Sequence, residues 1–197
     1  MRDRKPHINI CPAAARIVSV TSDIVQKARS DDRSYLLENE SKAILEAYGI
    51  RTTGAEVAQT EEGAVQIARN LGYPVVLKVV SRTVVHKTDA GGVKLDVKDD
   101  DGVRRAYREI TLSFAGQDLV GVAVQKMAAA GLEVIVGFTH DESFGPVLMF
   151  GLGGIFAEVL NDVTFRILPV TPDGIMEMIK EIKGYPLLAG YRGKEVD

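Results

Sequence analysis

Strand-like apolar segments follow one another in this chain without a helix between them. The segments 74–80 and 93–97 are joined by a polar loop, 81–92, and the segments 132–141 and 145–151 by only three residues. A uniformly parallel, doubly wound sheet needs a crossover helix between successive strands. The order of the segments therefore predicts an α/β fold of the mixed, α+β type.

Hydrophobic spacing adds the remaining elements. Helices are expected at 36–48, 61–71, 103–114, 155–160 and 172–182, and further strands at 55–58, 120–127 and 164–170. A weaker helical stretch around Asp23–Ala28 lies in residues 1–33, which we interpret as an extension. The small residues of Ala128–Gly131 predict a hinge, so we expect two lobes that meet near residue 127.

The composition excludes some classes of function. The chain has 197 residues, enough to bury a core, and a net charge of −3 from 24 basic and 27 acidic residues. This balance gives no indication of nucleic-acid binding. The longest uncharged stretch, Ser143–Ala157, is too short to span a membrane. Cys11 is the single cysteine, so no disulfide forms within the chain, and the cytoplasm is the expected compartment.

His86 is the strongest candidate for chemistry. It lies in a polar loop that continues through Lys87 and ends in Gly91 and Gly92. An imidazole nitrogen is available as a nucleophile or base at neutral pH. Loop N–H groups and Lys87 could hold a phosphoryl group on that nitrogen. The alternative is an ordinary loop histidine that is hydrogen-bonded to nearby backbone.

Lys78 is the only charged residue in the apolar segment 74–80. A lysine among apolar neighbours must reach solvent or meet an anion. It is therefore either an outward-facing residue of an edge strand or a point charge for a nucleotide phosphate. The glycines of GLGG, 151–154, precede an expected helix and would suit a phosphate, but a tight turn made for packing explains them equally well.

Acidic residues of the second half complete the candidates. Glu133 opens a strand just past the hinge. Glu158 and Asp162 are four residues apart, so on a helix both carboxylates would share one face, suited to Mg2+ or to orienting Arg166. The alternative is a solvated helix face.

Several strings of the sequence carry a resemblance to a known family. They are YGI at 48–50, GYPVVLKVVS at 72–81, VVHKTDAGGVKL at 84–95, GLEVIVG at 131–137, FGPVLMFGLGG at 144–154 and LLAGYRG at 187–193. Together they resemble the ATP-grasp subunit of NDP-forming acyl-CoA synthetases, of the ADP-forming acetate–CoA ligase type. The resemblance covers about residues 34–197 and implies a two-lobed ATP-grasp fold.

The resemblance implies a reversible ligase reaction, in which acyl-CoA, ADP and phosphate give a carboxylic acid, CoA and ATP. The ATP-grasp subunit would pass the phosphoryl group to ADP through a phosphohistidine, and the string HK-[ST]-x-x-GGV identifies this residue as His86. Lys78 would reach the nucleotide phosphates, and Gly91 with Gly92 would form a loop over them. ATP or ADP and Mg2+ are the implied cofactors.

Other roles follow from the same resemblance. Gln125, Lys126 and Met127 would form the interlobe segment that meets adenine through backbone groups, and Glu133 would bind the ribose hydroxyls. A CoA-binding α subunit, or a fused CoA-ligase domain, would form the acyl phosphate. The chain is therefore expected to work in a hetero-oligomer.

The resemblance also implies a domain division. The first lobe would cover about 54–126, and the second lobe 127–197 together with helix 36–48. The family continues into a helix and a strand ending in an acidic-x-Asn-Pro string that holds magnesium, whereas this sequence ends at Asp197. We therefore expect a C-terminally truncated, incomplete second lobe, with Glu158 and Asp162 as substitute metal ligands.

Two other classes of function compete with the ligase subunit. The chain would be a non-catalytic or regulatory ATP-grasp module, like the segments fused to some protein acetyltransferases, or an ATP-grasp carboxylate–amine ligase. Neither needs a phosphohistidine, so labelling with ATP distinguishes them from the acyl-CoA synthetase.

Overall fold

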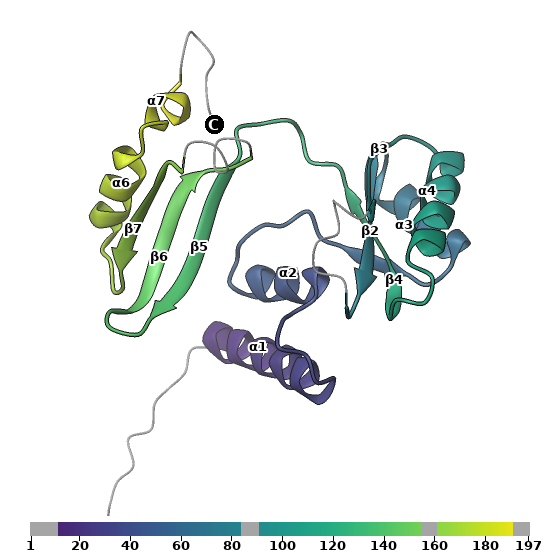
Figure 1. Cartoon of the computed structure of the whole chain (residues 1–197), viewed down its shortest axis with the longest axis horizontal. Coiled ribbons are helices and arrows are strands. Elements are labelled where there is room, and N and C mark those ends of the chain that lie inside the picture. The colour runs from purple at the N-terminus through teal and green to yellow at the C-terminus, as the bar shows by residue number, and fades with distance from the viewer. Residues whose placement is uncertain (1–11, 84–90, 155–160, 191–197) are drawn as a thin grey trace, which may run out of the picture. The chain divides into compact units, whose positions relative to one another are not determined.

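A computed structural model of the chain describes residues 12–83, 91–154 and 161–190 (Figure 1). The chain forms two compact units, Met1–Ala128 (unit 1) and Ala129–Asp197 (unit 2). Unit 1 contains α1 Pro12–Ser30, α2 Glu38–Ala47, β1 Glu56–Ala58, α3 Glu61–Leu71, β2 Val75–Ser81, β3 Val93–Val97, α4 Asp100–Ser113 and β4 Leu119–Lys126. Unit 2 contains β5 Val134–Asp141, β6 Gly145–Leu152, β7 Val163–Ile167, α6 Pro172–Glu181 and α7 Tyr185–Leu188. The predicted mixed α/β class is confirmed.

The sheet of unit 1 has the strand order β1-β4-β2-β3, and its described pairs are antiparallel. Figure 1 shows α3 and α4 on the same side of this sheet. The alternate residues of β2 that face these helices, Val75, Leu77 and Val79, are completely buried. They pack with the apolar faces of both helices, so the main core of unit 1 lies between the sheet and this helix pair.

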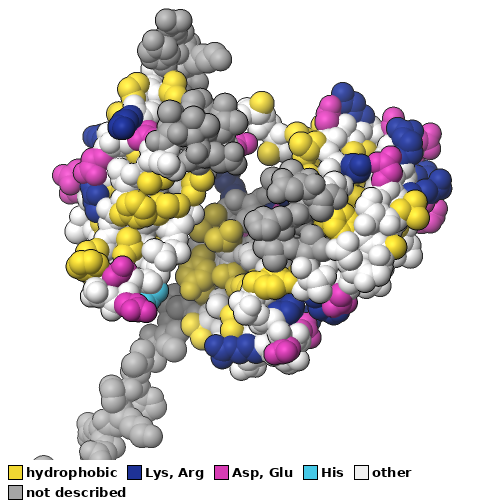
Figure 2. All heavy atoms as spheres, in the orientation of Figure 1, with side chains coloured by type: hydrophobic (Ala, Val, Ile, Leu, Met, Phe, Trp, Pro, Cys, Tyr) yellow, Lys and Arg dark blue, Asp and Glu magenta, His cyan; other side chains and the backbone are white. Residues whose placement is uncertain are grey.

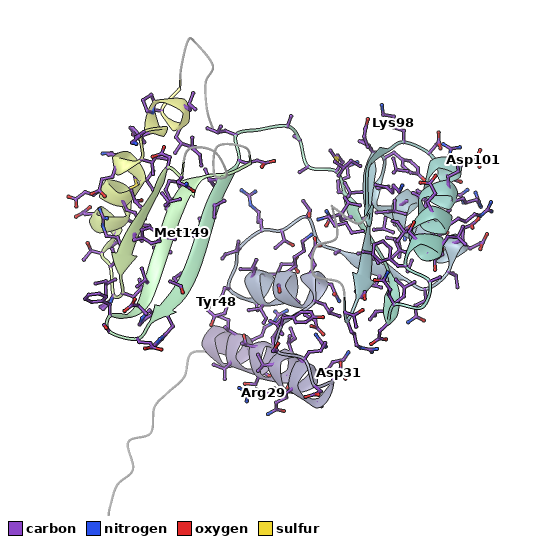
Figure 3. The ribbon with its side chains drawn as sticks, viewed as in Figure 1. Arg29, Asp31, Tyr48, Lys98, Asp101 and Met149 are labelled. Atoms are coloured by element: carbon purple, nitrogen blue, oxygen red, sulfur yellow. The ribbon has the colours of Figure 1, made fainter. Side chains whose placement is uncertain are left out.

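A side chain caps the start of each of the helices α3, α4 and α6. The Thr60 Oγ1 atom accepts a hydrogen bond from the Gly63 N–H at 3.0 Å, at the start of α3. Asp99 caps α4 in the same way, through the Gly102 N–H at 2.7 Å, and Lys98 and Asp101 flank this start (Figure 3). Thr171 caps α6 through the Gly174 N–H at 3.2 Å.

The opposite face of the unit 1 sheet is covered by the segment that leads into α2. Leu37 is buried there with Val80 and Ala123. The Arg33 guanidinium donates to both carboxylate oxygens of Glu40, at 2.8 and 2.9 Å, and fixes this segment to the first turn of α2. The side chains are only 4% and 11% exposed, so the pair is nearly desolvated.

One expectation about the N-terminal region needs correction. The extension holds a helix of 19 residues, α1, where the sequence indicated only a weak stretch near Asp23–Ala28. Its half-buried residues include Ile17, Val20 and Ile24, which recur at helical spacing. Serine and threonine residues between them weaken the apolar pattern. Helix α2 lies in unit 1, to which its side chains are hydrogen-bonded. The packing of this helix with the second lobe, which the resemblance implies, stays a prediction.

Unit 2 is a three-stranded antiparallel sheet in the order β5-β6-β7. Helix α6 packs on β6 and β7 and buries Met178 against them, and the Thr164 hydroxyl donates to the Met178 carbonyl at 3.0 Å. Val136 and Phe138 of β5 stay exposed. Figure 2 shows hydrophobic side chains on the surface of the chain. Within the described residues, no helix is long and apolar enough to cross a membrane.

We expect Glu40→Gln to lower the free energy of unfolding at about pH 7 by about 2–3 kcal/mol. The substitution leaves the buried Arg33 guanidinium with Asp31 as its remaining acidic partner, at 3.2 Å. Asp31 follows the end of α1 (Figure 3). Burial raises the pKa of Glu40, but the hydrogen bonds from Arg33 and from the Leu37 N–H outweigh it and hold the pKa below its ordinary value.

The sign of the pH dependence follows from that lowered pKa. The stabilisation by Glu40 is complete above the unfolded-state pKa of about 4.3 and is lost as the pH falls through the folded-state value. The difference between wild type and Glu40→Gln in urea unfolding should therefore shrink in acid. Glu142→Gln, at an exposed position, is the control. A difference that is the same at all pH values would contradict this assignment.

Candidate functional site

Lys78 lies on a central strand of the unit 1 sheet. On β2 it is paired with Ala123 of β4 on one side and with Val93 of β3 on the other. The edge-strand alternative is therefore wrong. Alternation along β2 turns Lys78 away from α3 and α4, since its neighbours Leu77 and Val79 fill the core on that side.

The lysine meets an anion rather than open solvent. The Lys78 Nζ atom donates to the Glu38 Oε1 atom of α2 at 2.8 Å, and the two side chains are 24% and 25% exposed. Burial raises the pKa of Glu38, but the hydrogen bond with Lys78 and the charges of Lys78 and Lys42 outweigh it, so the pKa lies below its ordinary value. Glu38 is therefore ionised at neutral pH.

The glycine pair lies directly beside the lysine strand. The Gly92 carbonyl accepts a hydrogen bond from the Val79 N–H at 2.8 Å. Gly91 has a φ of 74°, in the left-handed region that favours glycine, and a Cβ there would meet no atom of the described residues within 4 Å. Conformation rather than crowding therefore explains Gly91. His86, which precedes this pair, lies outside the described residues.

The end of β4 carries the predicted adenine segment. The buried Gln125 accepts a hydrogen bond at Oε1 from the Lys42 ammonium. The Lys126 ammonium donates to the carbonyls of Gly72 and Tyr73 at 2.7 and 2.8 Å. The Lys126 bonds hold β4 to the connection between α3 and β2, and the Gln125 bond holds it to α2.

The backbone at Met127 is also engaged. Its N–H donates to the Pro74 carbonyl at 3.1 Å. A contact between Met127 and adenine would therefore use another atom than this N–H. The structure thus places Lys78, Gly92 and Gln125 in one sheet of unit 1. Gly92 lies on one side of β2, bonded to Val79, and Gln125 of β4 lies on the other side, paired with Val76.

Sequence reasoning missed two residues of this group, Glu38 and Lys42. Their carboxylate and ammonium lie 3.2 Å apart, one turn apart on α2. The available signal was the Glu-to-Lys spacing of four residues on a predicted helix, which marks a paired face. A second signal was that Lys78, a charged residue on an apolar strand, needs a negatively charged partner. Sequence spacing alone does not identify that partner.

In unit 2, Glu133 directly precedes β5 and is exposed. Its carbonyl accepts a hydrogen bond from the Gly153 N–H at 2.7 Å. A Cβ at Gly153 would lie 2.9 Å from the Glu133 Cβ, and one at Gly154, whose φ is 58°, would lie 3.1 Å from the Glu133 Oε2. The GLGG glycines therefore allow close packing on Glu133, which supports the packing alternative.

The predicted carboxylate pair on a helix face is not what the structure shows. Asp162 lies just before β7 and outside any helix, after Asn161 with a φ of 46°. The buried Asp162 carboxylate accepts from the Lys183 and Gly184 N–H groups at 2.8 and 2.6 Å. Glu158 lies outside the described residues.

Arg166 is oriented by a different acid from those expected. Its guanidinium pairs with Glu181 of α6 at 2.5 Å. Across residues 12–83, 91–154 and 161–190, no three His, Cys, Asp or Glu side chains come together in a way that could hold a metal ion. The Asp162 carboxylate caps the segment after α6. The metal role expected for Glu158 and Asp162 stays a prediction.

We expect Asp162→Asn to reduce stability rather than metal affinity. An amide presents one acceptor and an NH2 group where two backbone N–H groups need two acceptors, so the free energy of unfolding should fall by about 1–3 kcal/mol. Urea unfolding followed by circular dichroism measures this loss. The control is Asp173→Asn, at an exposed position in the first turn of α6. An unchanged midpoint with a weakened response to Mg2+ would contradict the structural role.

Comparison with known proteins extends these observations. The family model of the ATP-grasp domain matches residues 27–197. The β subunit of ADP-forming acetate–CoA ligase I from Pyrococcus furiosus is 47% identical over 182 residues, which are 90% of this chain and 78% of that protein. ADP-forming acetate–CoA ligase II from Archaeoglobus fulgidus is 52% identical over 157 residues, 80% of this chain but 23% of that much longer protein.

A solved structure shows the same fold. The dinucleotide-forming acetyl-coenzyme A synthetase 1 of Ca. Korarchaeum cryptofilum, in complex with coenzyme A, Ca-AMPCP and HgCl+, matches with a TM-score of 0.85 and 44% identity. The match covers 89% of this chain and 79% of that chain. The resemblance seen in the sequence and the predicted ATP-grasp fold are confirmed, and this chain belongs to the ATP-grasp family of the ADP-forming acyl-CoA synthetases.

Proposed function

We propose that this chain is the nucleotide-binding component of an ADP-forming acyl-CoA synthetase. The reaction converts acyl-CoA, ADP and phosphate into a carboxylic acid, CoA and ATP, and it is reversible. The observation that carries the proposal is Lys78, an ammonium on a central strand with Gly91 and Gly92 at the start of the neighbouring strand. The relatives named above, one with a bound nucleotide analogue, support it.

In this proposal Lys78 places a positive charge on the nucleotide phosphates. A charge-assisted hydrogen bond from lysine to phosphate is among the stronger polar contacts in proteins. The backbone at Gly91 and Gly92 approaches the same phosphates, since glycine leaves the strand start unobstructed. Gln125 to Met127 contact the adenine, and Glu133 contacts the ribose hydroxyls. The wider assignment is that residues 34–197 form the ATP-grasp domain, after an extension of residues 1–33.

His86 is proposed as the residue that carries the phosphoryl group. An imidazole nitrogen attacks the terminal phosphorus of ATP, a P–N bond forms, and the P–O bond to ADP breaks. In the other direction an oxygen of ADP attacks the phosphorus on His86 and the P–N bond breaks, which gives ATP. A related structure with Mg-AMPPCP has a phosphohistidine segment that points towards its nucleotide-binding site.

The nucleotide brings Mg2+ with it in this proposal, where the ion neutralises charge on the phosphate oxygens. We assign no ligand of that ion to the described residues, because both Asp162 oxygens accept backbone N–H groups. The proposed partner is a CoA-binding α subunit or fused domain, since relatives occur both as β subunits and as longer chains. A cytoplasmic location suits such a reaction.

We expect Lys78→Met to weaken ATP binding about tenfold or more and to leave adenosine binding unchanged, because only ATP offers phosphates. Calorimetric titration of the 197-residue chain with both ligands tests this expectation. Lys98→Met, at a side chain that is 70% exposed, is the matched control. An equal loss for ATP and adenosine would show that Lys78 does not bind phosphate.

We expect His86→Ala to abolish formation of ATP from acyl-CoA, ADP and phosphate in the presence of the CoA-binding partner. Incubation with labelled ATP and Mg2+ should leave an acid-labile, base-stable phosphate on the wild-type chain and none on the variant. His140→Ala, at an exposed residue of β5, is the control. Turnover of the His86 variant near the wild-type rate would rule out the phosphohistidine and favour the regulatory module or the carboxylate–amine ligase.

A further inference from the structure

The contact between Lys78 and Glu38 joins two parts of the chain that are 40 residues apart. A lysine side chain has a long, flexible stem, and its ammonium samples many positions unless a partner holds it. Here the ammonium is held at 2.8 Å by one carboxylate oxygen, with both side chains about three-quarters removed from solvent. An ammonium has more than one N–H donor, so this bond does not exhaust its capacity for phosphate oxygens.

Glu38 is itself placed by a rigid support. It is the first residue of α2, directly after Leu37, which is 8% exposed and packs on Val80 and Ala123 of the sheet. The Leu37 N–H donates to the Glu40 Oε2 atom at 2.8 Å, and Glu40 is clamped by the buried Arg33. The helix start is therefore fixed on the same sheet face that presents Lys78.

Lys42 extends the arrangement to the adenine segment. Its ammonium lies 3.2 Å from the Glu38 carboxylate and donates to the Gly54 carbonyl at 3.0 Å. It also donates to Gln125 at the end of β4. Helix α2 thus contacts Lys78 through Glu38 and Gln125 through Lys42.

We propose that Glu38 is a positioning residue for phosphate recognition, and that it acts through Lys78. By holding the ammonium on the α2 side of the sheet, Glu38 reduces the side-chain freedom that Lys78 loses when it binds a phosphate. The proposal rests on the proposed function, because it requires Lys78 to be the phosphate-binding residue. It makes α2 part of the nucleotide site.

The competing hypothesis is that Glu38 weakens phosphate binding, because its carboxylate repels the negatively charged phosphates. Charge repulsion depends on the negative charge alone. Positioning depends on a hydrogen-bond acceptor that can reach the Lys78 ammonium. Glu38→Ala removes both the charge and the acceptor. Glu38→Gln removes the charge but keeps an acceptor oxygen at the same length of side chain. The two variants therefore separate the two effects.

The experiment is a calorimetric titration of the 197-residue chain with ATP and with adenosine. Glu38→Ala should weaken ATP binding about tenfold while adenosine binding stays unchanged. Glu38→Gln should lose clearly less, as a partial rescue. Glu46→Ala, on the exposed end of the same helix, is the matched control and should bind ATP as the wild type does. A loss of stability alone would not change the ratio of the two affinities.

A double-mutant cycle shows whether Glu38 acts through Lys78. In the Lys78→Met background, Glu38→Ala should cause no further loss of ATP affinity. The positioning proposal is overturned if Glu38→Ala tightens or preserves ATP binding, weakens ATP and adenosine alike, or causes the same loss in both backgrounds. If Lys78→Met weakens ATP binding and Glu38→Ala does not, the positioning proposal alone falls. If Lys78→Met has no effect, the phosphate assignment falls and the positioning proposal with it.

Discussion

A lysine on a central, largely buried strand has to keep its charge satisfied, and the Lys78–Glu38 ion pair meets this requirement. Since Glu38 must reach across to β2, α2 is held on the sheet face opposite α3 and α4. The chain before α2 is then fixed by the buried Arg33–Glu40 pair and by Leu37. One electrostatic requirement of a single strand therefore determines where the N-terminal part of unit 1 lies.

The elements with strong local signals were predicted well from the sequence. Thr60, Asp99 and Thr171 each stand before an amphipathic helix and accept the hydrogen bond expected of a cap. The succession of strands without crossover helices correctly indicated a mixed fold rather than a uniformly parallel sheet. Helix α1 was underestimated because its apolar face is only half buried, and a half-buried face leaves a weak periodic pattern.

The candidate site was predictable only in part, for a physical reason. Lys78, Gly92 and Gln125 were identified, and the structure places them in one sheet. Their partners Glu38 and Lys42 depend on tertiary packing, which local spacing does not report. Asp162 does not lie on the helix face expected for it and Glu158, because Asn161 before it has a φ of 46° and its carboxylate binds two backbone N–H groups. Glu158 lies outside the described residues.

Glycine has two different functions in this chain, and the difference bears on Glu133. Gly91 is required by its conformation, since its φ is 74° and a Cβ there would meet no described residue within 4 Å. Gly153 is required by crowding, since any Cβ would collide with Glu133, and its N–H is already bound to the Glu133 carbonyl at 2.7 Å. This N–H is therefore not available to a phosphate. The GLGG turn instead fixes the backbone from which the exposed Glu133 side chain projects.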